Sequence, residues 1–181
     1  MATFVIAALL VIGTVAFMEF FAWWAHKYIM HGWGWEWHRS HHEPHDETLE
    51  KNDLYAVVFA GVAVLLFWIG STYWPIWWIA FGVSCYGVLY FFAHDGLVHH
   101  RWPFRYVPKR GYFKRLYQAH RLHHAVKGKD GCVSFGFLWA PDLDRLKSQL
   151  RHNRKKMGLE LYESESASEP TASQEAAQRG L

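Results

Sequence analysis

The chain has 181 residues and a formal net charge of +3, which leaves room for one domain and little more. Trp, Tyr and Phe make up 18% of the residues, and 13 residues are His. The mean hydropathy of −0.10 is typical of a soluble protein, but this average hides long apolar blocks that alternate with His-rich and basic segments.

Three apolar blocks predict membrane-spanning helices. The first covers residues 1–25 and contains one formal charge, Glu19, whereas residues 54–74 and 76–93 contain none. A helix needs about 20 apolar residues to cross the hydrocarbon core. The first block lacks a basic start and a clear cleavage site, so we expect a retained helix rather than a signal peptide. A fourth apolar stretch, 132–140, is too short to span and is expected at most to dip into the interface.

The basic residues predict the topology. None precedes Lys27, and none lies between Lys51 and Arg101. The second and third spans are joined by a short turn around residues 71–75, so they form a hairpin that returns the chain to the side it left. All 19 Lys and Arg therefore lie on one side, which the positive-inside rule places in the cytoplasm. We expect a multi-pass protein of the inner (cytoplasmic) membrane.

Several cytoplasmic segments have helical patterns. Residues 26–45 continue from the first span, with glycines that loosen the helix and Pro44 that ends it. Asn52 or Asp53 is the expected N-cap of the second span. Residues 112–126 predict a further helix.

Residues 142–157 are amphipathic and basic, with Leu143, Leu146 and Leu150 on one side. This pattern suits a helix that lies on an anionic membrane surface. Residues 159–181 lack the apolar residues needed to fold, so we expect a disordered tail after a single membrane-embedded domain over residues 1–158. The predicted fold class is an all-α integral membrane protein with about three transmembrane helices and cytoplasmic helices that carry a di-metal site.

The histidines occur in two spacings that appear twice in the same order, H-x4-H followed by H-x2-H-H. On a helix, positions i, i+3 and i+4 share a face, so each H-x2-H-H presents three imidazoles on one side. Positions i and i+5 lie well apart on an α-helix, so each H-x4-H pair either reaches two different metals or unwinds the helix between its members. The boxed residues are His26, His31, His38, His41, His42, His94, His99, His120, His123 and His124.

Ten imidazoles at one membrane face are more than one metal ion can use, so the sequence predicts two ions. Imidazole suits Fe, Zn and Cu, and the residues leave the choice among them, and which His binds which ion, open. No Glu-x-x-His pattern is present, which excludes the soluble carboxylate-bridged di-iron bundle.

The other histidines have weaker claims to the site. A lone His is more often packed or hydrogen-bonded than a ligand, so we expect His152 to be unrelated to the metals. His45 follows Pro44, which separates it from the box before it. His100 competes with His99, and we favour His99 because it keeps the repeated spacing.

Three acidic residues are also candidates for a role. Glu19 is an ionisable group within a span, which marks it for function by default, but it lies close to the cytoplasmic end and we favour a structural role. Asp95 follows His94 directly and is a candidate acceptor that orients this imidazole. Asp130 is a weaker candidate for the same task.

Four stretches carry a resemblance to a known family. They are HKYIMHGWGWEWHRSHHEPH at 26–45, NDLYAVVFA at 52–60, HDGLVHHRWPFRYVP at 94–108 and AHRLHHAVKGKDGCVSFGFL at 119–138. With the spans between them, they resemble the fatty acid hydroxylase and sterol desaturase superfamily, and within it the short bacterial β-carotene hydroxylases.

This resemblance implies two Fe ions held by the ten boxed histidines, O2 as oxidant, and electrons from reduced ferredoxin or a similar carrier. It implies a monooxygenase that hydroxylates carbon 3 of carotenoid β-ionone rings. β-Carotene would become β-cryptoxanthin and then zeaxanthin, and the ketolated rings of canthaxanthin would lead to astaxanthin. The partners implied are a lipophilic carotenoid, membrane lipid and the electron donor, with no nucleic acid.

Four other functions compete with this interpretation. Another di-metal lipid hydroxylase or desaturase, or a carotenoid ketolase, would use the same metal chemistry. A metal transporter is disfavoured because the boxed His lie away from the predicted midplane and the spans have few polar residues. A membrane haem protein would instead need His on facing helices within the spans.

Overall fold

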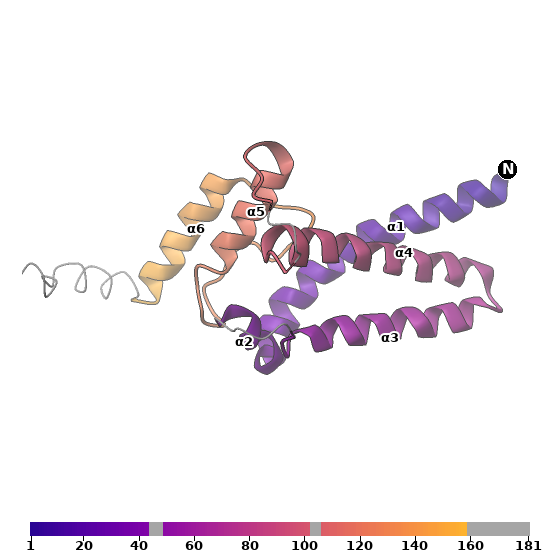
Figure 1. Cartoon of the computed structure of the whole chain (residues 1–181), viewed down its shortest axis with the longest axis horizontal. Coiled ribbons are helices and arrows are strands. Elements are labelled where there is room, and N and C mark those ends of the chain that lie inside the picture. The colour runs from indigo at the N-terminus through magenta and orange to yellow at the C-terminus, as the bar shows by residue number, and fades with distance from the viewer. Residues whose placement is uncertain (44–48, 102–105, 159–181) are drawn as a thin grey trace, which may run out of the picture.

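The computed structural model describes residues 1–43, 49–101 and 106–158, and these residues contain helices and no strand. The predicted all-α class is confirmed, whereas His45, Pro44 and the expected tail over 159–181 lie outside the described residues. The helical segments in chain order are α1 Ala2–Ala25, η1 His26–Trp33, α2 Trp35–His42, α3 Asp53–Gly70, α4 Trp74–Tyr90, η2 Phe91–Val98, α5 Gly111–His123 and α6 Leu143–Lys156 (Figure 1).

Three continuous helical stretches are long and apolar enough to cross a membrane, as predicted. They are Ala2–Trp33, Asp53–Gly70 and Trp74–Val98. The turn between α3 and α4 lies at the same end of the molecule as the N-terminus, and the His-bearing segments gather at the opposite end (Figure 1). The hairpin therefore returns the chain to the end that it left, as the distribution of basic residues predicts.

Helix α4 packs against both α1 and α3. Two close contacts of α4 depend on glycine. A Cβ atom at Gly82 would lie 2.7 Å from the Cβ atom of Thr14 in α1. At the hairpin end, a Cβ atom at Gly70 would lie 2.5 Å from the backbone nitrogen of Trp77. The glycines let the helix backbones approach closely, as small residues do in membrane bundles.

The first and third spans each end in a π-helix, η1 and η2. In η1 the amide of Gly34 donates to the carbonyl of Ile29, and in η2 the amide of His99 donates to the carbonyl of His94, both over 2.9 Å. These bonds join residues five positions apart, which is the π-helical pattern. Each H-x4-H pair is therefore brought to one face, and its ring centroids lie 5.2 Å apart for His26 and His31. The helix therefore widens at each H-x4-H box, so the two histidines share a face without reaching to different metal positions.

Helix α6 does not present its leucines to a membrane surface, so that prediction is wrong. Leu146 and Leu150 are buried in a core cluster formed with α5 and with the segment from Val126 to Ala140. The amphipathic pattern correctly marked the face that is buried, but the covering partner is α5 rather than lipid. The side chain of Asp142 caps this helix by accepting from the amides of Asp144 and Arg145.

The short apolar stretch over 132–140 is anchored by Glu19 of α1. One carboxylate oxygen of Glu19 accepts hydrogen bonds from the amides of Phe137, Leu138 and Trp139, each over 3.0 Å. The other oxygen accepts from the Tyr86 hydroxyl of α4 over 2.8 Å. Glu19 therefore joins two spans to this loop and buries the Phe137 ring, in agreement with the structural role expected for it.

We predict that Glu19→Gln lowers the free energy of unfolding by about 2–4 kcal/mol, because hydrogen bonds to a charged acceptor each contribute about 1.5–3 kcal/mol. The amide of Gln keeps one acceptor oxygen but presents a donor where the second oxygen was. Thermal denaturation of the detergent-solubilised protein measures the loss. Glu36→Gln is the matched control, because the Glu36 side chain is 68% exposed. An unchanged melting temperature in Glu19→Gln would contradict the role given to this carboxylate.

Candidate metal centre

The ten boxed histidines converge from η1, α2, η2 and α5 and from the residues that directly follow η2 and α5, and eight of them are buried. Their ligand atoms form two groups, and within each group these atoms lie within 4.8 Å of one another. The first group is His26, His31, His38, His42 and His123, and the second is His41, His94, His99 and His120. The remaining boxed residue, His124, borders the second group, because its Nε2 atom lies 3.0 Å from that of His120.

Each of the two groups includes one histidine from the other half of the chain. The first group takes four residues of the first pair of boxes, but it takes His123 from the second pair. The second group takes its residues from the second pair of boxes, but it takes His41 from the first. His41 and His123 are the middle members of the two H-x2-H-H boxes. Neither half of the chain therefore completes a group alone.

Seven of the imidazoles have their Nδ1 atom within 3.1 Å of an oxygen that can only accept a hydrogen bond, so Nδ1 carries the proton. This tautomer leaves the Nε2 lone pair facing the centre of each group, which is the form that binds a metal. The pairs are His26 with the Phe135 carbonyl, His31 with the Lys129 carbonyl, His38 with Asn52 Oδ1, His41 with Glu50 Oε1, His42 with the Val126 carbonyl, His94 with Asp95 Oδ1 and His123 with the Val133 carbonyl.

The Nε2 atoms of these imidazoles face one another at short range. The Nε2 atoms of His26 and His38 lie 3.0 Å apart, as do those of His41 and His94. The Nε2 atom of His123 lies 3.2 Å from that of His31. Because the protons are on Nδ1, these contacts set lone pair against lone pair, and a cation between them removes the repulsion. The donor set therefore fits metal ions that imidazole prefers, such as Fe, Zn or Cu.

Burial keeps the imidazoles of α2 and α5 neutral. It lowers the pKa of His38 to about 3, of His42 to about 4 and of His124 to about 2. Burial is also the main cause that holds the pKa values of His41 and His120 well below the ordinary value, and nearby imidazoles add to it. Neutral imidazole is the form that a metal ion requires, so no proton must be displaced at neutral pH.

Acidic residues lie beside the second group. Asp95, the expected acceptor, places Oδ1 2.7 Å from His94 Nδ1. Arg101 donates to both carboxylate oxygens of Asp53 over 2.8 Å, and its Nη1 atom lies 3.5 Å from Glu50 Oε1. The same nitrogen lies 3.8 Å from Asp95 Oδ2. One guanidinium therefore links three carboxylates at the edge of the site.

The contacts of Glu50, Asn52 and Arg101 are not predicted by the sequence, and the start of the second span has a different role from the helix cap expected there. Asn52 makes no side-chain capping bond and accepts from His38 instead. Asp53 accepts from the amide of Glu50 and pairs with Arg101. Polar residues at a helix start are so common that only their position between the two His boxes signals a further role.

The remaining candidates lie away from both groups. His100 has a positive φ of 53°, which turns its ring onto Tyr117, and the two rings stack with centroids 5.7 Å apart. His152 is exposed on α6. His31 donates its Nδ1 proton to the Lys129 carbonyl. Asp130, the weaker candidate for orienting an imidazole, is the next residue in the chain.

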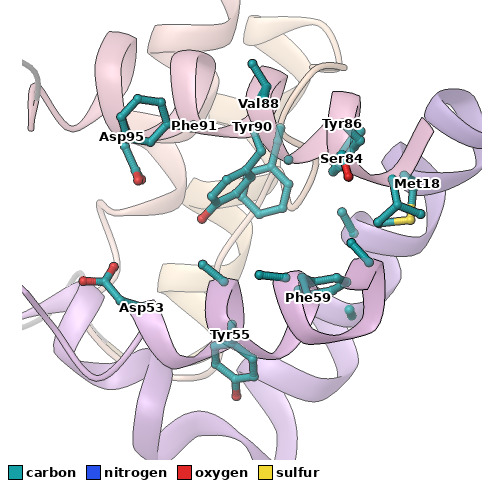
Figure 2. A pocket seen from close by; sticks show the side chains of 18 of the residues that line it. Met18, Asp53, Tyr55, Phe59, Ser84, Tyr86, Val88, Tyr90, Phe91 and Asp95 are labelled. Atoms are coloured by element: carbon teal, nitrogen blue, oxygen red, sulfur yellow. The ribbon is translucent and has the colours of Figure 1, made fainter. Parts of the chain in front are cut away.

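An apolar cleft of about 700 Å³ lies between α1, α3 and α4, and Tyr90 and Asp95 close to His94 form part of its wall. Figure 2 shows Met18 and Phe59 at one end of it and Asp53 and Asp95 at the other. Tyr90 lies between the cleft and the second group, since its ring stacks on His94 with centroids 4.6 Å apart. Phe137, which also lines the cleft, stacks on His26 of the first group with centroids 5.0 Å apart (not labelled in the figure).

A second apolar cleft, of about 1060 Å³, is lined by residues of α1, α3 and α4 and by the segment around α2. It is lined by Leu9 and Phe17 of α1 and by Trp33 and Trp37 near α2. The two clefts share Met18 and other residues as a common wall. Tyr90 and Phe137, which stack on histidines of the two groups, line the first cleft and not the second.

A protein-family model described as fatty acid hydroxylase matches residues 11–147. The chain is 62% identical to the β-carotene hydroxylase of Paracoccus sp. (strain PC1), over 80% of this chain and 91% of that protein. It is 64% identical to the β-carotene hydroxylase of Pantoea ananas, over 80% of this chain and 83% of that protein.

More distant relatives come from chloroplasts. The chain is 41% identical to the chloroplastic β-carotene 3-hydroxylase of Haematococcus lacustris, over 74% of this chain and 43% of that protein. No solved structure gives a significant match. These comparisons confirm the family resemblance that the His boxes and their flanking residues carry.

We predict that the purified protein binds two metal ions per chain, and that His123→Ala loses at least one of them because its imidazole completes the first group from the other half of the chain. Elemental analysis of the detergent-purified protein gives the stoichiometry. His152→Ala, at an exposed position on α6, is the matched control and keeps both ions. Two ions retained by His123→Ala would contradict the grouping.

Proposed function

Because the chain belongs to the fatty acid hydroxylase family and joins two groups of inward-facing imidazoles to an apolar cleft, we propose that it is a β-carotene 3-hydroxylase with a di-iron centre. The reaction converts β-carotene to β-cryptoxanthin and then to zeaxanthin, and canthaxanthin to astaxanthin. The observation that carries the proposal is the convergence of buried Nε2 lone pairs next to a cleft lined almost entirely by hydrocarbon. The names of the relatives favour a carotene as substrate over a fatty acyl chain or a sterol.

The ligands proposed for the two iron ions are the ten boxed histidines, divided as the two groups divide them. Bound iron would supply, with O2, the oxidising power for an unactivated C–H bond, which no side chain has. Overall, one oxygen atom enters the ring as a hydroxyl group and the other leaves as water. This balance requires two electrons and two protons from a donor for each hydroxyl group formed.

The chain's own residues hold the site and admit the substrate. Glu50, Asp95 and Asn52 orient His41, His94 and His38 by accepting their Nδ1 protons. The volume of the cleft is typical of a ligand site, and its lining suits a β-ionone ring that enters from the lipid. The two ends of β-carotene are equivalent, so one site serves both in turn.

The electron donor proposed is an acidic carrier of the ferredoxin type, at the cytoplasmic face of the inner membrane. Helix α6 buries Leu146 and Leu150 within the protein, so its exposed face carries Arg145, Lys147 and Arg151 into solution. A basic surface of this kind attracts an acidic protein partner. Helix α6 packs on α5, which bears two of the boxed histidines and is followed directly by a third, His124.

We predict that a bacterium engineered to accumulate β-carotene makes zeaxanthin when it expresses this chain, and that His120→Ala abolishes the product because an iron ligand is lost. Pigment extraction and chromatography measure the conversion. Unchanged β-carotene, with the protein present, metal-loaded and supplied with electrons, would sink the substrate assignment. A keto-carotenoid product would instead identify a ketolase.

We predict that Gly87→Leu lowers the conversion of β-carotene about tenfold or more, because Gly87 lines the first cleft and the new side chain would fill it. A Cβ atom at this position meets no atom within 4 Å, so the backbone here has room for a side chain to begin. The same pigment assay measures the effect.

Gly61→Leu is the matched control for this experiment. Gly61 lies on α3, lines neither cleft, and likewise has no atom within 4 Å of its added Cβ. Equal conversion by the two variants would show that the substrate ring does not use the first cleft.

A further inference from the structure

We infer that the two metal positions are unequal, and that Glu50 and Asp95 make the position of the second group the tighter metal site. The inference rests on the proposed di-metal centre and adds to it which position is stronger and which residues make it so. It follows from the chemical nature of the atoms that accept the Nδ1 protons in each group.

The first group donates its Nδ1 protons to neutral oxygens. His26, His31, His42 and His123 donate to main-chain carbonyls of one segment, between Val126 and Phe135. His38 donates to the side-chain amide oxygen of Asn52. These acceptors are dipoles without net charge, so they orient the imidazoles and add little charge to the ligands.

Two members of the second group, His41 and His94, donate to carboxylates. His41 Nδ1 lies 2.9 Å from Glu50 Oε1, and His94 Nδ1 lies 2.7 Å from Asp95 Oδ1. The side chains of Glu50 and Asp95 are only 2% and 17% exposed. Water therefore screens these charges less than it would at the surface, so they act more strongly on the imidazoles and on a bound cation.

Arg101 is shared by these two carboxylates and Asp53. Its guanidinium is paired most closely with Asp53, and Glu50 and Asp95 lie at the longer distances of 3.5 and 3.8 Å. Figure 2 shows Asp53 and Asp95 at the same end of the first cleft. Three carboxylates and one guanidinium leave this cluster of described residues net negative.

A carboxylate that accepts an Nδ1 proton makes the opposite Nε2 atom more basic, and its charge also attracts the divalent ion directly. Loss of such an outer partner typically weakens metal affinity about 10–100-fold. The second position should therefore bind a divalent ion more tightly than the first, although both are built from imidazole.

The test is an equilibrium competition between the metal-free, detergent-purified full chain and a chromophoric chelator for Zn²⁺, which has no redox chemistry. The unmodified protein should show two affinities. Glu50→Gln and Asp95→Asn should each weaken the tighter one about 10–100-fold and leave the weaker one in place. Both substitutions keep an acceptor oxygen and the shape of the side chain, so the lost quantity is charge.

A gain of affinity separates this effect from damage to the fold. Asn52→Asp places a carboxylate against His38 Nδ1, where the amide oxygen lies 2.7 Å away, and should tighten the weaker position. Glu36→Gln, which removes an exposed carboxylate of α2, is the matched control and should change neither affinity. Circular dichroism confirms that each variant keeps its helices.

Two zinc ions bound with equal affinity, or equal weakening of both positions by Glu50→Gln, would overturn this inference and leave the di-metal function standing. Fewer than two zinc ions bound by the unmodified protein would overturn the di-metal function and this inference with it. Tightening by Asn52→Asp together with selective weakening by Glu50→Gln would support it.

Discussion

The constraint on which this structure depends is the need to bury many imidazoles with their lone pairs facing inward. Each buried Nδ1–H must have an acceptor, since an unpaired buried donor costs about 1–3 kcal/mol. The chain meets this need from three sources: the carbonyls of the segment after α5, the polar residues at and just before the start of α3, and Asp95 of η2. The non-helical path over 126–140 therefore supports the candidate metal centre, because a helix would use those carbonyls for its own bonds.

The same constraint explains why Glu19 lies within a span. The loop that supplies carbonyls to the histidines also has free amides, and the Glu19 carboxylate accepts from three of them. Phe137 is held in this way against the ring of His26 and beside Tyr90. A charged group in an apolar environment is stable here because its hydrogen bonds are satisfied by the backbone and by a tyrosine.

Much of the fold could be predicted from the sequence, because hydrophobic length and the position of basic residues are local signals. The three spans follow from hydrophobic length, and the ten histidines follow from their repeated spacing. The π-helical turns were not, since the H-x4-H spacing fits either two metals or a changed helix. The covering of α6 by α5, and the contacts of Glu50 and Asn52 with histidines, depend on tertiary packing. Local patterns mark a face that is buried or polar, but not the partner that meets it.

The exchange of His41 and His123 between the groups has a consequence for the order of assembly during synthesis. The ribosome releases the residues of the first pair of boxes well before those of α5, yet the first group lacks a member until His123 has been made. The second group likewise includes His41 from the earlier half. Both sites therefore become complete late, after all three spans have been translated. If the proposed di-metal centre forms, the nascent chain has no complete metal site while it is being inserted, and the bound ions would join its two halves last.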